Sequence, residues 1–233
     1  MKLKDLEVII TGNPPPGLGG RYFTFVKVTT ACGIVGWGEV YAASLGPLTM
    51  KAVIEDIFDR HIVGEDPANI ELMFRRIYSS GFTQRPDPTI IGAFSGIEIA
   101  CWDILGKRRN LPIWKMLGGK LRDKIRSYTY LYPNRSHDAN KFYSSPSDSA
   151  EVAAACVAKG FTAIKFDPAG PYTIHGGHQP SLTDIGRSKD FCKMIREAVG
   201  NRADILFGTH GQFTPSGAIR LAKVLEEFDP LWF

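Results

Sequence analysis

Apolar positions in the first part of the chain follow a two-residue period that predicts short strands. Residues 3–11 form one such stretch, and β-branched and aromatic residues alternate partly with polar ones over residues 21–30. A glycine-rich turn and a further short strand follow within ACGIVGWGEV. Three successive strands with short connections predict an antiparallel meander.

The pattern then changes to the helical period. Apolar spacing predicts helices over residues 48–62, 69–80 and 89–107. The third segment is apolar around much of its circumference, which indicates a helix that is buried on several sides. The first part of the chain is therefore expected to be an α+β domain.

From about residue 125 onward, predicted strands and helices alternate. The strands are predicted at residues 125–132, 163–166 and 205–207, and the helices at residues 150–158, 184–199 and 215–228. Thr214 suits the N-cap of the last helix, and Pro215 suits its first position. The final residues PLWF would begin one more strand. Such alternation predicts a parallel sheet or a barrel.

The change of pattern places a boundary near residues 118–124. We expect an α/β protein with two domains, at residues 1–120 and 121–233. A closed barrel of eight units takes about 250 residues. The second domain would thus hold the first three to four strands of a barrel that is incomplete at its C-terminus, and the alternative is a small open sheet that is complete as it stands.

Composition and charge narrow the class of protein. Of the 233 residues, 44% are hydrophobic and 22% are charged, as in soluble globular proteins. The net charge of +4 is scattered, so we expect no nucleic-acid partner. Without a signal peptide or an apolar run of about 20 residues, we expect a cytoplasmic protein with no membrane contact. The cysteines form no CxxC pair, and buried free thiols are expected at Cys32, Cys101, Cys156 and Cys192.

Two polar residues stand at the end of the predicted strand in IKFDP. Lys165 and Asp167 are two residues apart, so their side chains would share one face of the strand. In parallel α/β barrels the functional side chains lie at this end of the strands. A lysine there can act as a base, although a neighbouring carboxylate would keep it charged. The alternative is a simple Lys–Asp pair at the edge of a loop.

A histidine follows the next predicted strand in ILFGTHGQF. His210 lies in a small polar turn ahead of a capped helix, and its titration near neutral pH makes it a candidate acid or base. The alternative is a structural histidine.

His175 and His178 are three residues apart in a glycine-rich loop with no third ligand in view, so we expect an exposed loop there rather than a metal site. Phosphate-loop, GxGxxG and GxSxG motifs are missing.

Two longer stretches resemble a known family. VKVTTACGIVGWGEV and SGIEIACWDILGKRRNLPIWKMLGGKLRDKIRSY are similar to the capping domain of the enolase superfamily, mandelate racemase branch, and most similar to acid-sugar dehydratases of the galactonate dehydratase type. The resemblance implies an N-terminal α+β capping domain followed by part of a (β/α) TIM-type barrel. It also implies that the loop at residues 13–22 and the region near Ser44 close over the barrel mouth, with Arg21 as a candidate substrate contact, and that the protein is a homo-oligomer.

The chemistry implied by the resemblance is removal of the proton next to a carboxylate, with Mg²⁺ stabilising the enediolate. The family's metal ligands are carboxylates at the ends of the third, fourth and fifth barrel strands. Matched by position, Lys165 falls on the first lysine of the family's Lys-x-Lys motif, and Asp167 stands where the second lysine is expected. His210 falls on the histidine that is expected to protonate the departing hydroxyl. Gly208 occupies the third-strand carboxylate position, so we identify no metal ligand in the chain. The remaining ligands and the usual His–Asp base would lie beyond Phe233.

The sequence therefore predicts a lyase, an acid-sugar dehydratase that acts on a small-molecule sugar acid. His210 and Lys165 are its expected catalytic residues, and Arg21 and Asp167 its expected substrate contacts. Mg²⁺ is the implied cofactor, with Gly208 as the feature that counts against it. The alternatives are a non-catalytic or metal-deficient member of the superfamily and a racemase or cycloisomerase on the same scaffold.

Overall fold

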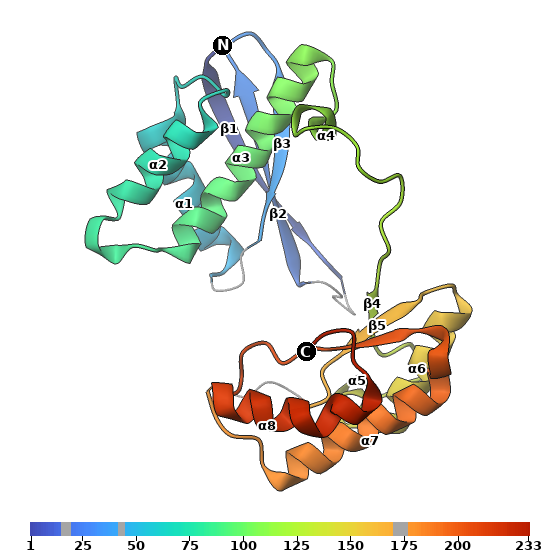
Figure 1. The fold of residues 1–233 in the computed structure, drawn as a ribbon. Helices are drawn as coiled ribbons and strands as arrows, with labels where there is room; N and C mark the ends of the chain where they lie inside the picture. Colours follow the sequence, from blue (N-terminus) through green and yellow to red (C-terminus); the bar gives the residue numbers. More distant parts are fainter. Residues whose placement is uncertain (15–19, 42–44, 170–176) are drawn as a thin grey trace. The chain divides into compact units, whose positions relative to one another are not determined.

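A computed structural model of the chain describes residues 1–14, 20–41, 45–169 and 177–233 (Figure 1). Most of the loop predicted at residues 13–22, the position of Ser44 and that of His175 lie outside the described residues. The chain divides into two compact units, Met1–Asp123 and Lys124–Phe233, and each unit has its own cluster of buried hydrophobic side chains. The two units are therefore described separately.

The first unit contains the predicted meander. Its strands are antiparallel in the order β1-β2-β3, with bounds Leu3–Gly12, Tyr22–Thr30 and Val35–Val40. Every second residue of β2 from Thr24 to Thr30 is buried, which is the alternation expected of a strand with one face on the core.

The helices of the first unit follow the sheet in the chain. They are α1 (Pro47–Ile57), a π-helical turn (Phe58–Ile62), α2 (Ile70–Ser80), a 3₁₀ turn (Phe82–Gln84), α3 (Pro88–Arg109) and α4 (Ile113–Met116). The three predicted helices are confirmed, except that the last turn of the first one widens to π geometry. The short α4 was not predicted, because four residues do not complete an amphipathic period.

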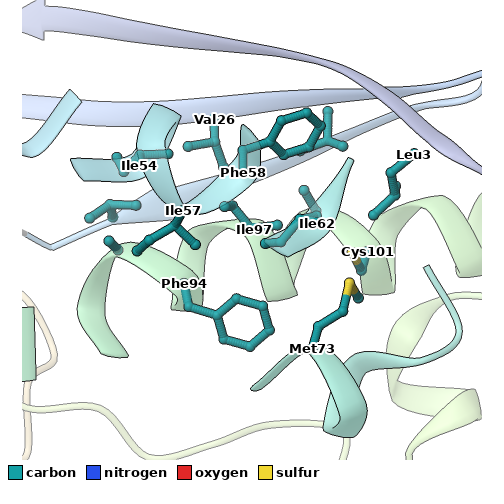
Figure 2. Close-up of a cluster of buried hydrophobic side chains, with 14 of the residues drawn as sticks. Leu3, Val26, Ile54, Ile57, Phe58, Ile62, Met73, Phe94, Ile97 and Cys101 are labelled. Carbon is teal, nitrogen blue, oxygen red and sulfur yellow. The ribbon is translucent and has the colours of Figure 1, made fainter. Parts of the chain in front are cut away.

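Helix α3 is the central helix of this unit. Its first turn is capped by Asp87, which accepts hydrogen bonds from the backbone N–H of Thr89 at 2.9 Å and of Ile90 at 3.3 Å. Figure 2 shows Phe94, Ile97 and Cys101 of this helix pointing into the hydrophobic cluster. Among the described residues it is also the one helix long and apolar enough to cross a bilayer, a property that core helices share. Its packing against the sheet and its neighbours accounts for that apolar surface.

The second unit is built from parallel strands and helices. Its elements are β4 (Thr129–Tyr130), α5 (Ala139–Phe142), α6 (Pro146–Ala158), β5 (Ala163–Phe166), α7 (Leu182–Val199), a 3₁₀ turn (Gly200–Arg202), β6 (Asp204–Phe207), α8 (Pro215–Leu225) and a 3₁₀ turn (Glu226–Phe228). The strands pair in the order β4-β5-β6 (Figure 1). Thr214 caps α8 as predicted, since its hydroxyl oxygen accepts from the N–H of Gly217 at 3.2 Å.

The two faces of the parallel strands differ. Ile164 and Phe166 of β5, and Ile205 and Phe207 of β6, join the hydrophobic cluster that includes residues of α6, α7 and α8. The intervening residues must point to the opposite face, because side chains alternate along a strand. That opposite face carries Lys165.

Two strand predictions need correction in extent. The strand predicted at residues 125–132 is regular only at Thr129–Tyr130. Ahead of it, Ile125 is exposed, and the Arg126 side chain turns aside to bond Thr162 and Asp204. The PLWF segment forms a single bridge, in which Trp232 pairs in parallel with Leu206. Pairing with only one described neighbour keeps both segments short.

The cysteines are free, but two are less buried than predicted. Cys101 and Cys192 are buried, Cys156 is half-buried and Cys32 is exposed. Burial raises the pKa of the Cys101 thiol to about 12 and raises the pKa of Cys192 as well, so both stay protonated at neutral pH. Cys32 is exposed because it lies in the turn between β2 and β3, where the periodicity of the strands does not apply.

Candidate active site

A row of side chains crosses the face of the parallel strands that points away from the helices. Tyr130 of β4 pairs with Lys165 of β5, Lys165 pairs with Leu206 of β6, and Leu206 pairs with Trp232. Paired residues of parallel strands carry their side chains on the same face. The lysine therefore lies in a row between two aromatic residues and a leucine.

The Lys165 ammonium is close to both rings of this row. Its Nζ atom lies 5.8 Å from the centre of the Tyr130 ring and 5.9 Å from that of Trp232. Aromatic faces attract cations at this separation. The two rings thus hold the Lys165 side chain between them.

Asp167 and Gly208 form the next step along the same face. The backbone continues the ladder there, since the N–H of Gly208 donates to the carbonyl of Phe166 at 2.9 Å. A Cβ placed on Gly208 would overlap Oδ1 of Asp167 and lie 2.9 Å from Cε of Lys165. Lys165 and Asp167 thus share one face, as predicted, and the Asp167 carboxylate occupies the space above Gly208.

The Asp167 carboxylate lies between a phenol and an imidazole. The Tyr130 hydroxyl donates to Oδ2 at 2.7 Å, and His210 Nε2 lies 3.6 Å from Oδ1. The Asp167 side chain is only 10% exposed, whereas that of His210 is 49% exposed. The contact becomes an ion pair when the imidazole is protonated. A shielded carboxylate is thus in contact with an accessible histidine.

A tight turn presents His210. His210 and Gly211 have φ values of 46° and 68°, and the N–H of Gln212 donates to the carbonyl of Thr209 at 3.1 Å. Positive φ at both central residues is the property of a type I′ turn. Histidine is among the residues that adopt this left-handed conformation more often than most. The turn reverses the chain directly after β6 and keeps the imidazole at the end of the strand.

A further phenol lies near the carboxylate. Burial raises the pKa of Tyr143, and its electrostatic interactions with Tyr132 and Asp167 raise that pKa further. Tyr143 is therefore a neutral hydroxyl at physiological pH, able to donate a hydrogen bond in the vicinity of Asp167.

The structure brings three of the four predicted site residues together. Lys165, Asp167 and His210 gather at the carboxyl ends of β5 and β6. Arg21 is exposed and belongs to the first unit, so its role stays an expectation. Sequence reasoning missed Tyr130 and Trp232. The strand-end rule that identified Lys165 also applies to Tyr130, but the first strand was predicted too long to locate its end.

The same residues offer one carboxylate to a divalent cation. Within the described ranges, no group of three His, Cys, Asp or Glu side chains is arranged to hold a metal ion. Asp167 does place a shielded carboxylate at the strand ends, and carboxylate oxygens are the ligands that Mg²⁺ prefers. Because Gly208 has no side chain, it leaves room for that carboxylate. Asp167 is thus an oxygen donor of the kind that Mg²⁺ takes, and a magnesium ion here would need its further ligands from elsewhere.

The predicted His175/His178 loop is described only from Gly177 onward. The His178 ring packs edge-on against Phe213 at 5.2 Å, and its backbone carbonyl accepts from the N–H of Thr214 at 3.0 Å. These contacts attach His178 to the segment that precedes α8.

Comparisons with known proteins agree on one family. Residues 18–118 match the mandelate racemase / muconate lactonizing enzyme N-terminal domain, and residues 148–233 match the enolase C-terminal domain-like family. A D-galactonate dehydratase of Klebsiella pneumoniae (strain 342) is 34% identical over 214 residues, which cover 89% of this chain and 50% of that protein. The chain thus spans about half the length of this curated relative.

Solved structures show the same likeness. The crystal structure of a mandelate racemase/muconate lactonizing enzyme from Jannaschia sp. CCS1 is 64% identical with a TM-score of 0.94, over 100% of this chain and 60% of that one. The corresponding protein from Sulfitobacter sp. is 64% identical with a TM-score of 0.95, over 100% of this chain and 59% of that one. At this level of similarity, both units have the arrangement of elements found in these proteins.

Proposed function

The chain belongs to the mandelate racemase/muconate lactonizing enzyme branch of the enolase superfamily, and from this premise we propose that the protein is a lyase that dehydrates a sugar acid. Its two parts are an N-terminal domain and part of an enolase-type C-terminal domain. We assign residues 1–120 to the capping domain and residues 121–233 to the first strands of a (β/α) barrel. The similarity to a D-galactonate dehydratase supports the reaction class and leaves the choice of sugar acid open.

The observation that carries the proposal is the cluster of Lys165, Asp167 and His210. Nε2 of His210 lies 3.6 Å from the Asp167 carboxylate, and Lys165 reaches the same face two residues earlier on β5. The Lys165 cation can bind a carboxylate substrate, and the imidazole of His210 beside Asp167 can move a proton.

The reaction removes one proton and one hydroxyl from neighbouring carbons. The C–H bond next to the substrate carboxylate breaks, and its electron pair forms the enediolate. The C–O bond of the β-hydroxyl then breaks, and the oxygen leaves as water with a proton from the His210 imidazolium. The enol product tautomerises to a 2-keto-3-deoxy acid.

Lys165 serves as the positive partner of the enediolate in this scheme. Two aromatic rings hold it at this face of the strands, and an ammonium group there stabilises negative charge as it develops on the substrate. The family resemblance assigns the base that takes the α-proton to a later strand. Lys165 as the base itself is the alternative.

Enolase superfamily members generally bind Mg²⁺. When bound, the ion supplies positive charge that stabilises the enediolate oxygens. Arg21 belongs to the same proposal as a contact for a carboxylate or hydroxyl of the substrate, because a guanidinium forms paired hydrogen bonds with carboxylates. We further propose a homo-oligomer in the cytoplasm, with no nucleic-acid or membrane partner.

The test is to incubate the full-length protein with a panel of sugar acids and Mg²⁺ in D₂O and to follow the reaction by NMR. We expect one substrate to yield a 2-keto-3-deoxy acid that carries deuterium at C3. A cyclic or epimeric product would instead establish a cycloisomerase or racemase. The absence of both α-proton exchange and divalent-ion binding would establish a non-catalytic member of the family.

A further inference from the structure

Gly208 is a glycine for reasons of space rather than backbone conformation. Its φ lies outside the positive range in which glycine is favoured, so the backbone would accept a larger residue. A Cβ at this position would nevertheless overlap the Asp167 carboxylate and crowd the Lys165 side chain. The Asp167 rotamer and a side chain on residue 208 are therefore mutually exclusive.

The two positions are neighbours across adjacent strands. Phe166 pairs with Phe207, so Asp167 and Gly208 stand side by side one residue further along. Adjacent strands lie about 4.8 Å apart. If the Asp167 side chain leans from β5 toward β6, its carboxylate can therefore reach the space above Gly208. A side chain on residue 208 would project into that same space. The Asp167 carboxylate thus fills the space that a side chain on residue 208 would otherwise take.

The Asp167 carboxylate is held in this position. Its side chain is 10% exposed, and Tyr130 donates to Oδ2 at 2.7 Å, while Oδ1 is the oxygen that covers Gly208. A hydrogen bond to one oxygen orients a ligating carboxylate, as second-shell donors do at metal sites. The orientation of Asp167 is thus set before any ligand binds.

Charge points to the kind of ligand that this carboxylate takes. The substrate of the proposed reaction is an anion, and an anion placed directly against Asp167 would be repelled. A divalent cation between the two carboxylates removes the conflict, because oxygen ligands from both sides satisfy it.

We propose that Asp167 is a metal ligand and supplies from β5 the carboxylate that Gly208 cannot supply from β6. This inference rests on the proposed function, which requires a cation beside the substrate carboxylate. Gly208 is then a condition for the metal site, because only the smallest residue leaves room for the Asp167 carboxylate.

The test measures metal binding by the full-length protein without substrate. Mn²⁺ replaces Mg²⁺ as the probe, and the free Mn²⁺ signal in electron paramagnetic resonance gives the dissociation constant. Asp167→Asn keeps the shape of the side chain and removes its charge. We expect its affinity for Mn²⁺ to fall by about tenfold or more. His178→Asn is the control and should leave the affinity within about twofold, because its ring packs against Phe213 and is not a ligand in this proposal.

A paired exchange keeps the test decisive if the single variant is poorly folded. Asp167→Gly combined with Gly208→Asp returns the carboxylate to β6 and removes the overlap. We expect the double variant to regain Mn²⁺ affinity, while Gly208→Asp alone loses stability because two carboxylates compete for one space. Wild-type affinity in Asp167→Asn, no recovery in a folded double variant, or no Mn²⁺ binding by the wild type would each overturn the proposal.

The outcome is separate from that of the dehydration assay. Dehydration by the wild type with unchanged Mn²⁺ binding in Asp167→Asn would leave the proposed function standing and remove the ligand assignment. Loss of Mn²⁺ binding in Asp167→Asn, together with no turnover of any sugar acid by the wild type, would support the ligand assignment and remove the proposed function.

Discussion

His210 is the residue whose role separates the two halves of the proposed reaction. Its imidazole is half exposed and lies 3.6 Å from the Asp167 carboxylate, which suits a proton donor that a substrate can reach. If it protonates the departing hydroxyl, removal of the α-proton does not depend on it. The two steps can therefore be measured independently in one variant.

For His210→Asn we expect dehydration to fall by roughly 10²–10⁴-fold, the usual effect of losing a general acid, while α-proton exchange continues. Both are followed by NMR in D₂O with the substrate that the wild type accepts. His178→Asn is the matched control, because that ring packs against Phe213 and has no place in the scheme. Equal loss of exchange and dehydration in His210→Asn would make His210 the base instead.

The residues of the site differ in how far the sequence could predict them. Lys165, Asp167 and His210 lie at or just after the ends of strands that are short, apolar and clearly bounded, so the strand-end rule locates them. Tyr130 escaped because its strand has only two regular residues. The overlap between Asp167 and a side chain on residue 208 depends on the register of two strands, and hydrophobic pattern alone does not determine that register.

At the scale of elements, the contact between β3 and α3 depends on glycines from both sides. A Cβ on Gly38 would overlap the carbonyl oxygen of Gly96, and a Cβ on Gly96 would come within 2.5 Å of Val40 Cγ2. The strand and the helix thus approach each other closely through backbone atoms. The helix cannot move away without opening the core beneath Ile97, which is fully buried.

We therefore expect Gly38→Ala to lower the free energy of unfolding by about 1–3 kcal/mol or more, the cost of overpacking. Gly12→Ala is the control, since no atom lies within 4 Å of the added methyl group and the backbone does not require glycine there. Urea denaturation followed by circular dichroism compares the two variants. Equal stability of Gly38→Ala and Gly12→Ala would show that β3 and α3 can separate without cost.

The π-helical turn after α1 contains His61, which makes the folded chain less stable in acid than at neutral pH. Burial lowers the pKa of His61, and the nearby Arg60 and Arg76 lower it further. The unfolded chain binds a proton near the ordinary value of about 6.5, whereas the folded chain binds it only at lower pH. Its contribution to stability is thus fully present above about pH 6.5 and is lost as the pH falls toward the folded pKa.

Replacing this histidine should reduce the sensitivity of the first unit to acid. We expect His61→Gln to lose less stability than the wild type between pH 7.5 and pH 5, because glutamine does not titrate. Urea midpoints at the two pH values provide the comparison. An identical loss in both proteins would assign the acid sensitivity to other groups.

Helices long enough to repeat the apolar spacing over several turns were predictable, and elements of only a few residues were not. The predicted helices at residues 69–80 and 184–199 agree with α2 and α7 to within two residues at each end. α4 and α5 have four residues each, too few for a helical period. The π-helical ending of α1 follows from packing, since Phe58 and Ile62 are both buried and propensity alone would continue the α-helix.

At the scale of the whole molecule, the residues that the structure describes form two hydrophobic clusters that share no residue. One joins the antiparallel sheet to α1, α2 and α3, and the other joins the parallel strands to α6, α7 and α8. Each unit therefore has the internal packing that an independent cooperative unit needs. The units unfold separately only if the stability of one does not depend on that of the other. Because the clusters are separate, each can be destabilised alone and the effect on the other unit measured.

Two core substitutions measure this coupling. Ile97 and Ile164 are fully buried, one in each cluster, so replacing either with alanine should cost about 2–5 kcal/mol in its own unit. Amide hydrogen exchange followed by mass spectrometry localises the effect. With independent units, Ile97→Ala accelerates exchange in β2 and α3 and leaves β5 and β6 unchanged, while Ile164→Ala does the opposite. If either substitution accelerated exchange equally in both units, the two clusters would unfold together as one cooperative structure. The boundary near residues 118–124 would then mark a change of sequence pattern and not a border between two folding units.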